Sequence, residues 1–247
     1  MKLLVIGDSC TDIFRYGEVS KLASEAPIPV IKPEKETSNP GMAGNVVANL
    51  KVLGADVDFI TNKREIRKIR YVCSKYNHLL LRVDENDACE RIDIENVLCT
   101  IDWEEYDAII ISDYCKGFIN DLDIEYIAAS HPLTFLDTKK TLGNWARNIS
   151  FIKINSAEHK NNKEIFKNNK DLLKKSIITK GPSGCSYRGH IYPTKEVSVK
   201  DVSGAGDTFL AGLVKNYVST KNIKEAIKFA QECTTIVVQK SGVSTIK

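Results

Sequence analysis

The stretch KDVSGAGDTFLAGL, residues 200–213, sets three small residues between a β-prone run and a helix-like apolar pattern. Glycines with free N–H groups at the start of a helix form an anion site, because the unsatisfied donors and the helix dipole both favour negative charge. The donors here would come from Gly204, Ala205 and Gly206. Asp207 follows them at once, and because an anion repels a carboxylate, this acid needs an explanation.

Phosphoryl transfer would explain the acid, because the backbone donors hold the migrating group while Asp207 accepts the proton of the attacking hydroxyl. A glycine turn whose Asp only caps the helix explains the same spacing about as well. The usual nucleotide fingerprints do not decide between them, since there is no GxxxxGK[ST] and no GxGxxG follows the first apolar run.

Composition limits the class of protein. A chain of 247 residues with 43% hydrophobic content can bury a full core, so we expect residues 1–247 to form a single domain. The net charge of +3 is too slight to indicate a nucleic-acid partner. The seven cysteines form no CxxC pair, and the apolar run MKLLVIG ends at Asp8, so we expect a cytoplasmic protein without membrane contact.

Short apolar runs alternate with helix-like patterns along the chain. This alternation predicts an α/β doubly wound, mostly parallel sheet flanked by helices. Ligands bind such sheets at the carboxyl ends of the strands. The runs cover residues 2–8, 56–61, 107–113, 133–138, 150–155 and 175–180, and the polar residues at their ends are Asp8, Asp113, Asp137, Asn155 and Lys180.

Two segments do not follow this alternation. Residues 13–40 hold four of the seven prolines, which excludes a long helix, and residues 69–84 alternate like a hairpin with its turn near residues 75–77. Together they predict a small β-sheet lid over the strand ends, whose exposed edges would suit a homodimer. Residues 160–175 repeat apolar side chains at helical spacing, which predicts a solvated helix with one buried face.

The motif DVSGAGDTFLAG resembles the DTxGAGDxF signature of the ribokinase-like (PfkB) carbohydrate kinases. Within that family, the opening of the chain with EAPIPVIK, and PGMAGNVVANLKVLGA, are most similar to the kinases of D-glycero-D-manno-heptose 7-phosphate. Several motifs in one order are far more specific than one. The further motifs, in family order, are SDYCKG (112–117), FLDTKK (135–140), INSAEHK (154–160), ITKGPSG (178–184) and GVSTI (242–246).

The resemblance implies an ATP- and Mg²⁺-dependent, ribokinase-like kinase that phosphorylates the anomeric hydroxyl of this heptose phosphate. Asp207 would be the general base, and the backbone of residues 204–206 the anion hole. Asn155 and Glu158 match the NxxE motif that positions Mg²⁺ through water. The resemblance places Asp12, Gly41, Asn45, Asp113 and Lys116 at the sugar phosphate, and Lys139, Asn155, Lys180, Gly181, Gly184 and Gln231 at the nucleotide.

Each match also has a purely structural explanation. Asp12 can cap a helix, Asn45 can be an N-cap, Asp113 can end a strand, and Asn155 with Glu158 fit a capping pair. Two other functions also stay open, namely a diverged protein that binds sugar or nucleotide without turnover, and a PfkB kinase of another sugar or a nucleoside. The retained Asp207 and NxxE pair favour a kinase.

The chain also departs from the family pattern. Met42 stands where a glycine is usual, and its side chain would narrow the sugar pocket or redirect it. The chain passes from Asn62 almost directly to KIRYVC (68–73), so we expect the sheet to lack one edge unit that the family usually inserts. Gln231 stands where an adenine-side Asn is frequent. These 247 residues hold no counterpart of the adenylyltransferase domain fused to some relatives, and we expect no nucleotidyl transfer from them.

Overall fold

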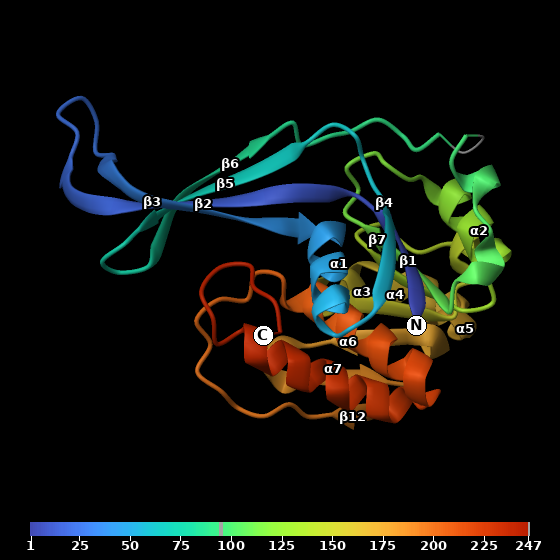
Figure 1. Cartoon of the computed structure of the whole chain (residues 1–247). Coiled ribbons are helices and arrows are strands. Elements are labelled where there is room, and N and C mark those ends of the chain that lie inside the picture. The colour runs from blue at the N-terminus through green and yellow to red at the C-terminus, as the bar shows by residue number, and fades with distance from the viewer. Residues whose placement is uncertain (94–95, 247) are drawn as a thin grey trace.

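The computed structural model of the chain describes residues 1–93 and 96–246, and its body is built on an eight-stranded sheet (Figure 1). Six neighbouring strands, β10-β9-β8-β7-β1-β4, run parallel, and the hairpin β11–β12 adds two antiparallel strands at one edge. The predicted mostly parallel sheet is thus confirmed. The strands are β1 (Lys2–Gly7), β4 (Asp56–Ile60), β7 (Ala108–Asp113), β8 (Thr134–Thr138), β9 (Phe151–Asn155), β10 (Ser176–Thr179), β11 (Cys185–Tyr187) and β12 (His190–Tyr192).

Helices cover both faces of this sheet. Leu3 and Val5 of β1 pack in one core with α1 (Ala43–Val52), α6 (Ala205–Thr220) and α7 (Ile223–Val237). Leu4 and Ile6 point to the other core, which α2 (Asp121–Ser130), α4 (Lys163–Asn168) and α5 (Lys170–Lys175) cover. Because both faces are buried, the strands show continuous apolar runs without polar alternation. No helix in the described part of the chain is long and apolar enough to cross a membrane.

A second, four-stranded sheet projects from the body and forms the lid (Figure 1). Its strand order is β3-β2-β5-β6, with β2 and β5 parallel in the centre. The strands begin before the predicted segments because β2 follows β1 after a single residue, and the turn between β5 and β6 falls at residues 74–77, as predicted. The lid strands are β2 (Ser9–Leu22), β3 (Pro29–Met42), β5 (Ile66–Cys73) and β6 (His78–Glu85).

The connection from the body into β5 is very short. β4 is the edge strand of the main sheet, and β5 begins only a few residues after it. Asn62 closes this connection, since its Oδ1 accepts from the N–H of Ser9 at 2.7 Å and its Nδ2 donates to the carbonyl of Arg64 at 2.6 Å. β4 is the last strand at this edge, and the lack of one further edge unit stays a prediction.

The single helix predicted for residues 160–175 is wrong in its continuity. The region folds as α3 (Ser156–Asn161), α4 and α5, which break at Asn162 and Asn169. Asn169 accepts from the N–H of Leu172 at 3.2 Å, so its side chain starts a new helix. Four short 3₁₀ helices complete the fold, at Leu98–Thr100, Trp103–Glu105, Asn144–Ala146 and Gly181–Ser183 among the described residues.

Candidate active site

The N-terminus of α6 has the geometry of an anion site. Gly204 is its N-cap residue with φ of +77°, a left-handed conformation that favours glycine. A Cβ on Gly204 would lie 2.5 Å from Asn45 Nδ2, and one on Gly206 would lie 2.8 Å from Lys153 Nζ. Within the described residues no acceptor takes the N–H of Gly206 or of Asp207. These two donors are therefore available to a ligand.

Asp207 lies in the first turn of α6 and is only 3% exposed. Its Oδ2 accepts from Asn45 Nδ2 at 3.0 Å, and its Oδ1 accepts from the phenol of Tyr114. Burial raises the pKa of Asp207 to about 6; the charge of Asp137 adds to this rise, and the hydrogen bonds from Tyr114 and Asn45 oppose it. A carboxylate with this pKa can take a proton near neutral pH.

The contacts of Asp207 argue against the capping explanation. The N-cap of α6 makes no side-chain hydrogen bond, and both carboxylate oxygens of Asp207 are engaged by side chains from other elements. An N-terminal cap would instead accept from backbone N–H groups of its own helix. The side chain of Asp207 therefore does not cap α6.

Two lysines and a second carboxylate surround this turn. Lys153, on β9 and 4% exposed, donates to Asp137 Oδ2 at 2.7 Å. Lys139 Nζ lies 2.6 Å from Glu158 Oε1 and 3.7 Å from Asp137 Oδ1. Burial alone would lower the pKa of Lys139, but the charges of Asp137 and Glu158 and the hydrogen bond that Lys139 donates to Glu158 outweigh it and raise that pKa. Positive charge therefore stays beside the anion site at any physiological pH.

Asn155 and Glu158 form a capping box at the start of α3, as their structural explanation predicts. Asn155 Oδ1 accepts from the N–H of Glu158 at 2.9 Å, and Glu158 Oε2 accepts from the N–H of Asn155 at 2.7 Å. Because Lys139 and Asn155 Nδ2 take Glu158 Oε1, direct coordination of a metal by this carboxylate would cost several hydrogen bonds.

A hydrated Mg²⁺ nevertheless fits this part of the site. Asp137 Oδ1 is buried and accepts no hydrogen bond in the structure, so an oxygen acceptor is left for a water of the ion. Mg²⁺ keeps several waters and uses few carboxylates. Among the described residues no three His, Cys, Asp or Glu side chains gather as a metal site, which suits contacts through water.

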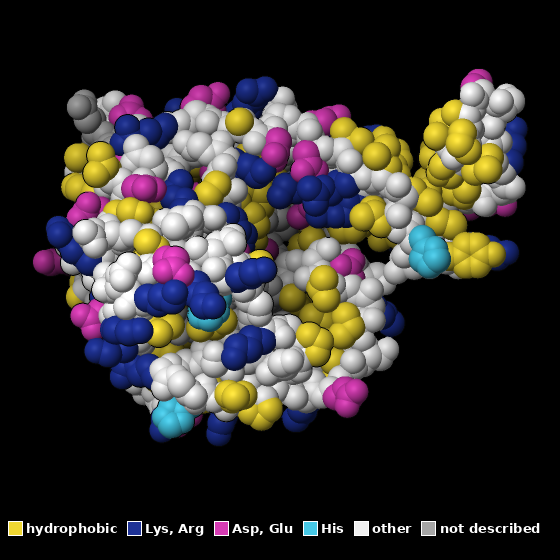
Figure 2. All heavy atoms as spheres, turned by 180° about the vertical axis from the view of Figure 1, so that it is seen from behind, with side chains coloured by type: hydrophobic (Ala, Val, Ile, Leu, Met, Phe, Trp, Pro, Cys, Tyr) yellow, Lys and Arg dark blue, Asp and Glu magenta, His cyan; other side chains and the backbone are white. Residues whose placement is uncertain are grey.

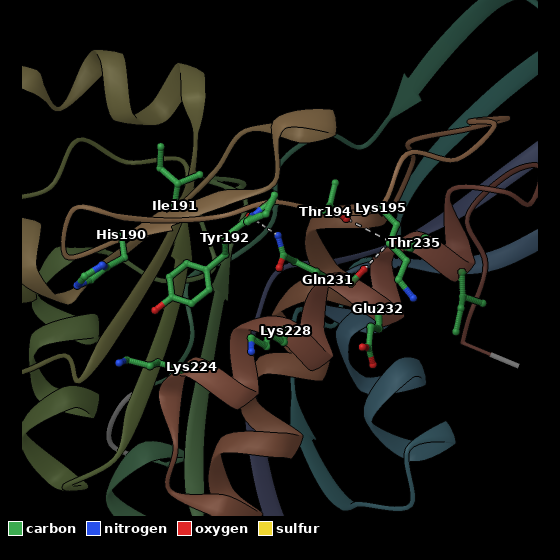
Figure 3. Close-up of a pocket in the computed structure, with 12 residues that line it drawn as sticks. His190, Ile191, Tyr192, Thr194, Lys195, Lys224, Lys228, Gln231, Glu232 and Thr235 are labelled. Atoms are coloured by element: carbon green, nitrogen blue, oxygen red, sulfur yellow. Dashed lines mark hydrogen bonds between the residues drawn. The ribbon is translucent and has the colours of Figure 1, made fainter.

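Three of the six predicted nucleotide residues, Gly181, Gly184 and Gln231, line two adjoining cavities, whereas Lys139, Asn155 and Lys180 line neither. A small cavity of about 120 Å³ joins the turn at Gly181 and Gly184 to Ala205 and Gly206 at the start of α6. Gln231 of α7 lines it together with Thr194, and both also line a larger cavity of about 710 Å³ between β12 and α7 (Figure 3). The combined space is in the range that a nucleotide occupies. Lys180 lies at the N-cap of the 3₁₀ turn and lines neither cavity.

Gln231 is fixed rather than free in this region. Its Nε2 donates to the carbonyl of Tyr192 at 2.7 Å, and Figure 3 shows this bond bridging α7 and β12. A Cβ on Gly184 would lie 2.1 Å from the same carbonyl and 2.9 Å from Gln231 Nε2. Only a glycine at position 184 therefore lets the KGxxG turn approach α7.

Three of the predicted sugar residues lie together at the base of the lid. Asp12 sits on β2, so it does not cap a helix, and it forms an ion pair with Arg70 of β5. A Cβ on Gly41 would lie 2.1 Å from Asp12 Oδ2, so the glycine makes room for this carboxylate. Asn45 is the third residue of α1 rather than its N-cap, and it turns to Asp207.

Two other predicted sugar residues point to different partners. Asp113 is buried and accepts from Thr138 Oγ1 at 2.6 Å and from the N–H of Cys115 at 3.0 Å. Lys116 pairs with Asp87 at 2.6 Å. These contacts fit the structural explanation of Asp113 as a strand end that holds the following loop. Figure 2 shows Lys and Arg side chains gathered where the lid leaves the body.

Met42 adopts φ of +57° and is 3% exposed, packed with Cys10 and Ile66. This backbone conformation is one that glycine adopts without strain. The methionine thus retains the local geometry of the glycine that the family pattern has there, and it places its side chain under the lid.

Sequence reasoning missed Tyr114, Lys153 and Arg70 as parts of this site. Tyr114 lies inside the SDYCKG motif between the charged residues Asp113 and Lys116, and a tyrosine there carries no signal of a catalytic contact. Lys153 is a charge within the apolar run SFIKIN, and since lysine is seldom fully buried, this position alone was a signal. Arg70 carried no such signal, because alternation on a hairpin does not tell which face turns to the body.

Solved structures of low sequence identity share this fold. Ribokinase of Arabidopsis thaliana complexed with ribose and ATP aligns with a TM-score of 0.70 at 16% identity, covering 99% of this chain and 94% of that chain. Ribokinase of Thermotoga maritima aligns with a TM-score of 0.69 at 16% identity over 98% and 94%. The fold of the chain is ribokinase-like.

Sequence comparison identifies the family. Residues 137–247 match the pfkB family carbohydrate kinase. The bifunctional protein HldE of Nitratiruptor sp. is 31% identical over 292 positions, covering 99% of this chain, and that of Vibrio cholerae is 26% identical over 99%. Over residues 137–247 the chain thus matches the pfkB family of carbohydrate kinases, and its HldE relatives align over nearly its whole length.

The chain spans 63% of the length of the Nitratiruptor relative. The alignment covers 292 positions although the chain has 247 residues, so the relative carries additional residues within the aligned region. This difference in length agrees with a shortened sheet, and the position of the lacking unit after Asn62 stays a prediction.

Proposed function

We propose that this chain transfers the γ-phosphoryl group of Mg·ATP to a sugar phosphate, and that the acceptor is the anomeric hydroxyl of D-glycero-D-manno-heptose 7-phosphate. One observation carries the proposal. A buried carboxylate, Asp207, with a pKa raised to about 6, follows directly on backbone N–H groups that have no acceptor among the described residues. A base and an anion hole one residue apart suit in-line phosphoryl transfer.

In the proposed reaction the sugar hydroxyl oxygen attacks the γ-phosphorus and gives its proton to Asp207. The bond from the γ-phosphorus to the bridging oxygen breaks, and ADP leaves. The N–H groups of Gly206 and Asp207 would donate to the charge that develops on the transferred group. Lys153 Nζ lies close to Gly206, since a Cβ on Gly206 would be 2.8 Å from it. Mg²⁺, when bound, neutralises phosphate charge, and Asn155, Glu158 and Asp137 would hold its waters.

The heptose assignment rests on the N-terminal half of the chain. The EAPIPVIK and PGMAGNVVANLKVLGA motifs resemble heptose phosphate kinases, and the relatives named bifunctional protein HldE align over nearly the whole chain. The lid carries Asp12 and Arg70 over the site, which offers a carboxylate for sugar hydroxyls and a cation for a phosphate. The lid would also exclude water from the reacting groups.

The proposal is tested by ADP release from Mg·ATP, with the heptose 7-phosphate present and absent. We expect release that saturates with this sugar, and much slower release with ribose or fructose 6-phosphate, because these lack either the phosphate or the heptose chain. Saturable binding of sugar and ATP without ADP release would instead establish a binding protein. Faster release with another sugar or a nucleoside would refute the heptose assignment and keep the kinase.

We further propose that the lid joins two copies of the chain. Exposed apolar side chains gather on it (Figure 2), and β6 is an edge strand with free backbone donors and acceptors. Leu81→Asp should therefore shift a dimer to monomer in sedimentation velocity, while Leu122→Asp on α2 should not. A wild-type monomer at high concentration would contradict the proposal. The exposed apolar residues of the lid are Leu22, Ile28, Tyr76, Leu79, Leu81 and Val83.

We also propose that the protein acts in the cytoplasm. All seven cysteine thiols are free, and the pKa of the Cys10 thiol is raised to about 12, chiefly by burial. Free thiols persist in a reducing compartment. Cell fractionation with detection of the chain would test this location.

A further inference from the structure

Both oxygens of the base are already engaged in this structure. Asn45 Nδ2 donates to Asp207 Oδ2 at 3.0 Å, and the Tyr114 phenol donates to Oδ1, which leaves the carboxylate 3% exposed. A substrate hydroxyl must donate to one of these oxygens before it can lose its proton. The Tyr114 hydroxyl thus occupies the position that the acceptor hydroxyl needs.

Resting on the proposed kinase function, we propose that Tyr114 gates the base: its phenol holds Asp207 when no sugar is bound and rotates away when the sugar hydroxyl takes its place. The exchange replaces one O–H donor by another of the same kind. It therefore costs less than exposing an unpaired buried carboxylate would.

The backbone around Tyr114 is fixed, so the motion is confined to the side chain. The N–H groups of Tyr114 and Phe118 donate to the buried Asp8 carboxylate at 2.7 and 3.2 Å. The side chain itself is partly exposed and packs against the Cys10 and Met42 cluster at the base of the lid. A ring rotation can proceed here without unfolding the loop.

Two lysines hold the ring in the closed position. Lys139 Nζ lies 5.1 Å and Lys68 Nζ 5.5 Å from the centre of the Tyr114 ring. Lys68 comes from lid strand β5, whereas Lys139 follows β8 of the body. Such cation–π contacts are weak compared with an ion pair to phosphate. An arriving phosphate group would attract these lysines from the ring and favour opening.

The gate would suppress hydrolysis of ATP in the absence of sugar. In that side reaction a water oxygen attacks the γ-phosphorus, a proton of the water passes to Asp207, and the bond to the bridging oxygen breaks to release ADP and phosphate. While the Tyr114 phenol donates to Oδ1, a water cannot use the same acceptor position. Removal of the Tyr114 hydroxyl should let a water donate to Asp207 Oδ1.

We expect Tyr114→Phe to raise ADP release without sugar by roughly tenfold or more, and to lower the KM of the sugar by a similar factor, because the competing hydroxyl is gone. Tyr106→Phe is the matched control. The Tyr106 phenol also donates to a carboxylate, that of Asp58, at 2.8 Å, and Lys2 Nζ lies 5.0 Å from the centre of its ring. Tyr106 lies at the opposite, amino-terminal end of β7. Tyr106→Phe should leave both ADP release without sugar and the KM of the sugar unchanged.

The variants separate a gate from a fixed support. A lower kcat in Tyr114→Phe, with ADP release without sugar unchanged, would overturn the gate and make Tyr114 a permanent holder of the base. The increase in ADP release without sugar should be absent from the double variant Tyr114→Phe, Asp207→Asn. If the increase remained in the double variant, the gate would be overturned. Lys68→Met supplies a second variant that leaves the Asp207 contacts intact and should raise release without sugar to a smaller extent.

Failure of the heptose assignment gives a different result. The assay without sugar uses only Mg·ATP and water, so a rise that depends on Asp207 supports the gate whichever sugar is the substrate. Absence of heptose-dependent release in the wild type would then refute the proposed acceptor alone. Where the wild type shows sugar-dependent release, an unchanged rate without sugar in both Tyr114→Phe and Lys68→Met would refute the gate alone.

Discussion

Asp207→Asn should lower kcat for sugar phosphorylation by a factor of about 10²–10⁴, the usual contribution of a positioned general base. An amide cannot accept the proton of the sugar hydroxyl at neutral pH. The KM of the sugar should change little, because the amide of Asn can accept from Asn45 through its oxygen and donate to the phenol oxygen of Tyr114 through its nitrogen. Steady-state ADP release over a range of sugar concentrations measures both quantities. Asp121→Asn, an exposed acid in the first turn of α2, is the control.

The same substitution should not destabilise the fold. The folded-state pKa of Asp207 is about 6, above its ordinary 3.8, so the ionised form is disfavoured by folding. The contribution of Asp207 to the free energy of unfolding is therefore highest below pH 4, where Asp207 is protonated in both states. It falls as pH rises through 6, and the total loss at higher pH is about 3 kcal/mol. An uncharged Asn avoids this loss. An inactive variant with a lower melting temperature at pH 8 would contradict this interpretation of Asp207.

The pH dependence of the wild type supplies a second check on the base. Because Asp207 must be ionised to accept a proton, kcat/KM should fall tenfold per pH unit below about pH 6. Of the groups that face it, Asp137 adds to the rise in its pKa that burial causes, and Tyr114, Asn45 and Lys153 oppose this rise. A flat profile down to pH 5 would show that another group takes the proton.

The main sheet could be predicted because its parallel strands are buried on both faces. Runs such as LLVIG and AIIIS are short and continuously apolar, as strands buried on both faces are. Each is followed by a polar residue at the same edge of the sheet. The hairpin β11–β12 escaped prediction, because its strands have only three residues each and Ile191 on it is exposed. Short edge strands carry too little periodicity to be recognised.

The parts of the site that are formed by neighbouring residues of one motif could be predicted from the sequence. Contacts between side chains that are far apart in the sequence could not. Gly204 and Asp207 are neighbours in sequence, and so are the glycines of the KGxxG turn. Tyr114 reaches Asp207 from a loop 93 positions away, and that contact depends on how β7 and α6 are placed. The break of the predicted helix at Asn169 likewise depends on a capping bond that helical spacing of apolar residues does not reveal.

Gly204→Ala should lower kcat by a factor of about 10²–10³, as loss of an oxyanion-hole donor does. The added Cβ would lie 2.5 Å from Asn45 Nδ2, so either this side chain or the start of α6 must shift. Asn45 would then release Asp207 Oδ2, and the N–H groups of the first turn would turn away from the phosphoryl group. One methyl group thus disturbs both the base and the anion hole.

Backbone strain must be separated from this effect, and Gly189 offers the control. Its φ of +79° matches the +77° of Gly204, but a Cβ there would meet nothing within 4 Å. Gly189→Ala and Gly204→Ala should therefore share a strain cost of about 1–2 kcal/mol in the free energy of unfolding. Only Gly204→Ala should lose turnover, as urea denaturation and ADP release would show. Equal kcat in the two variants would mean that the phosphoryl group does not bind at the start of α6.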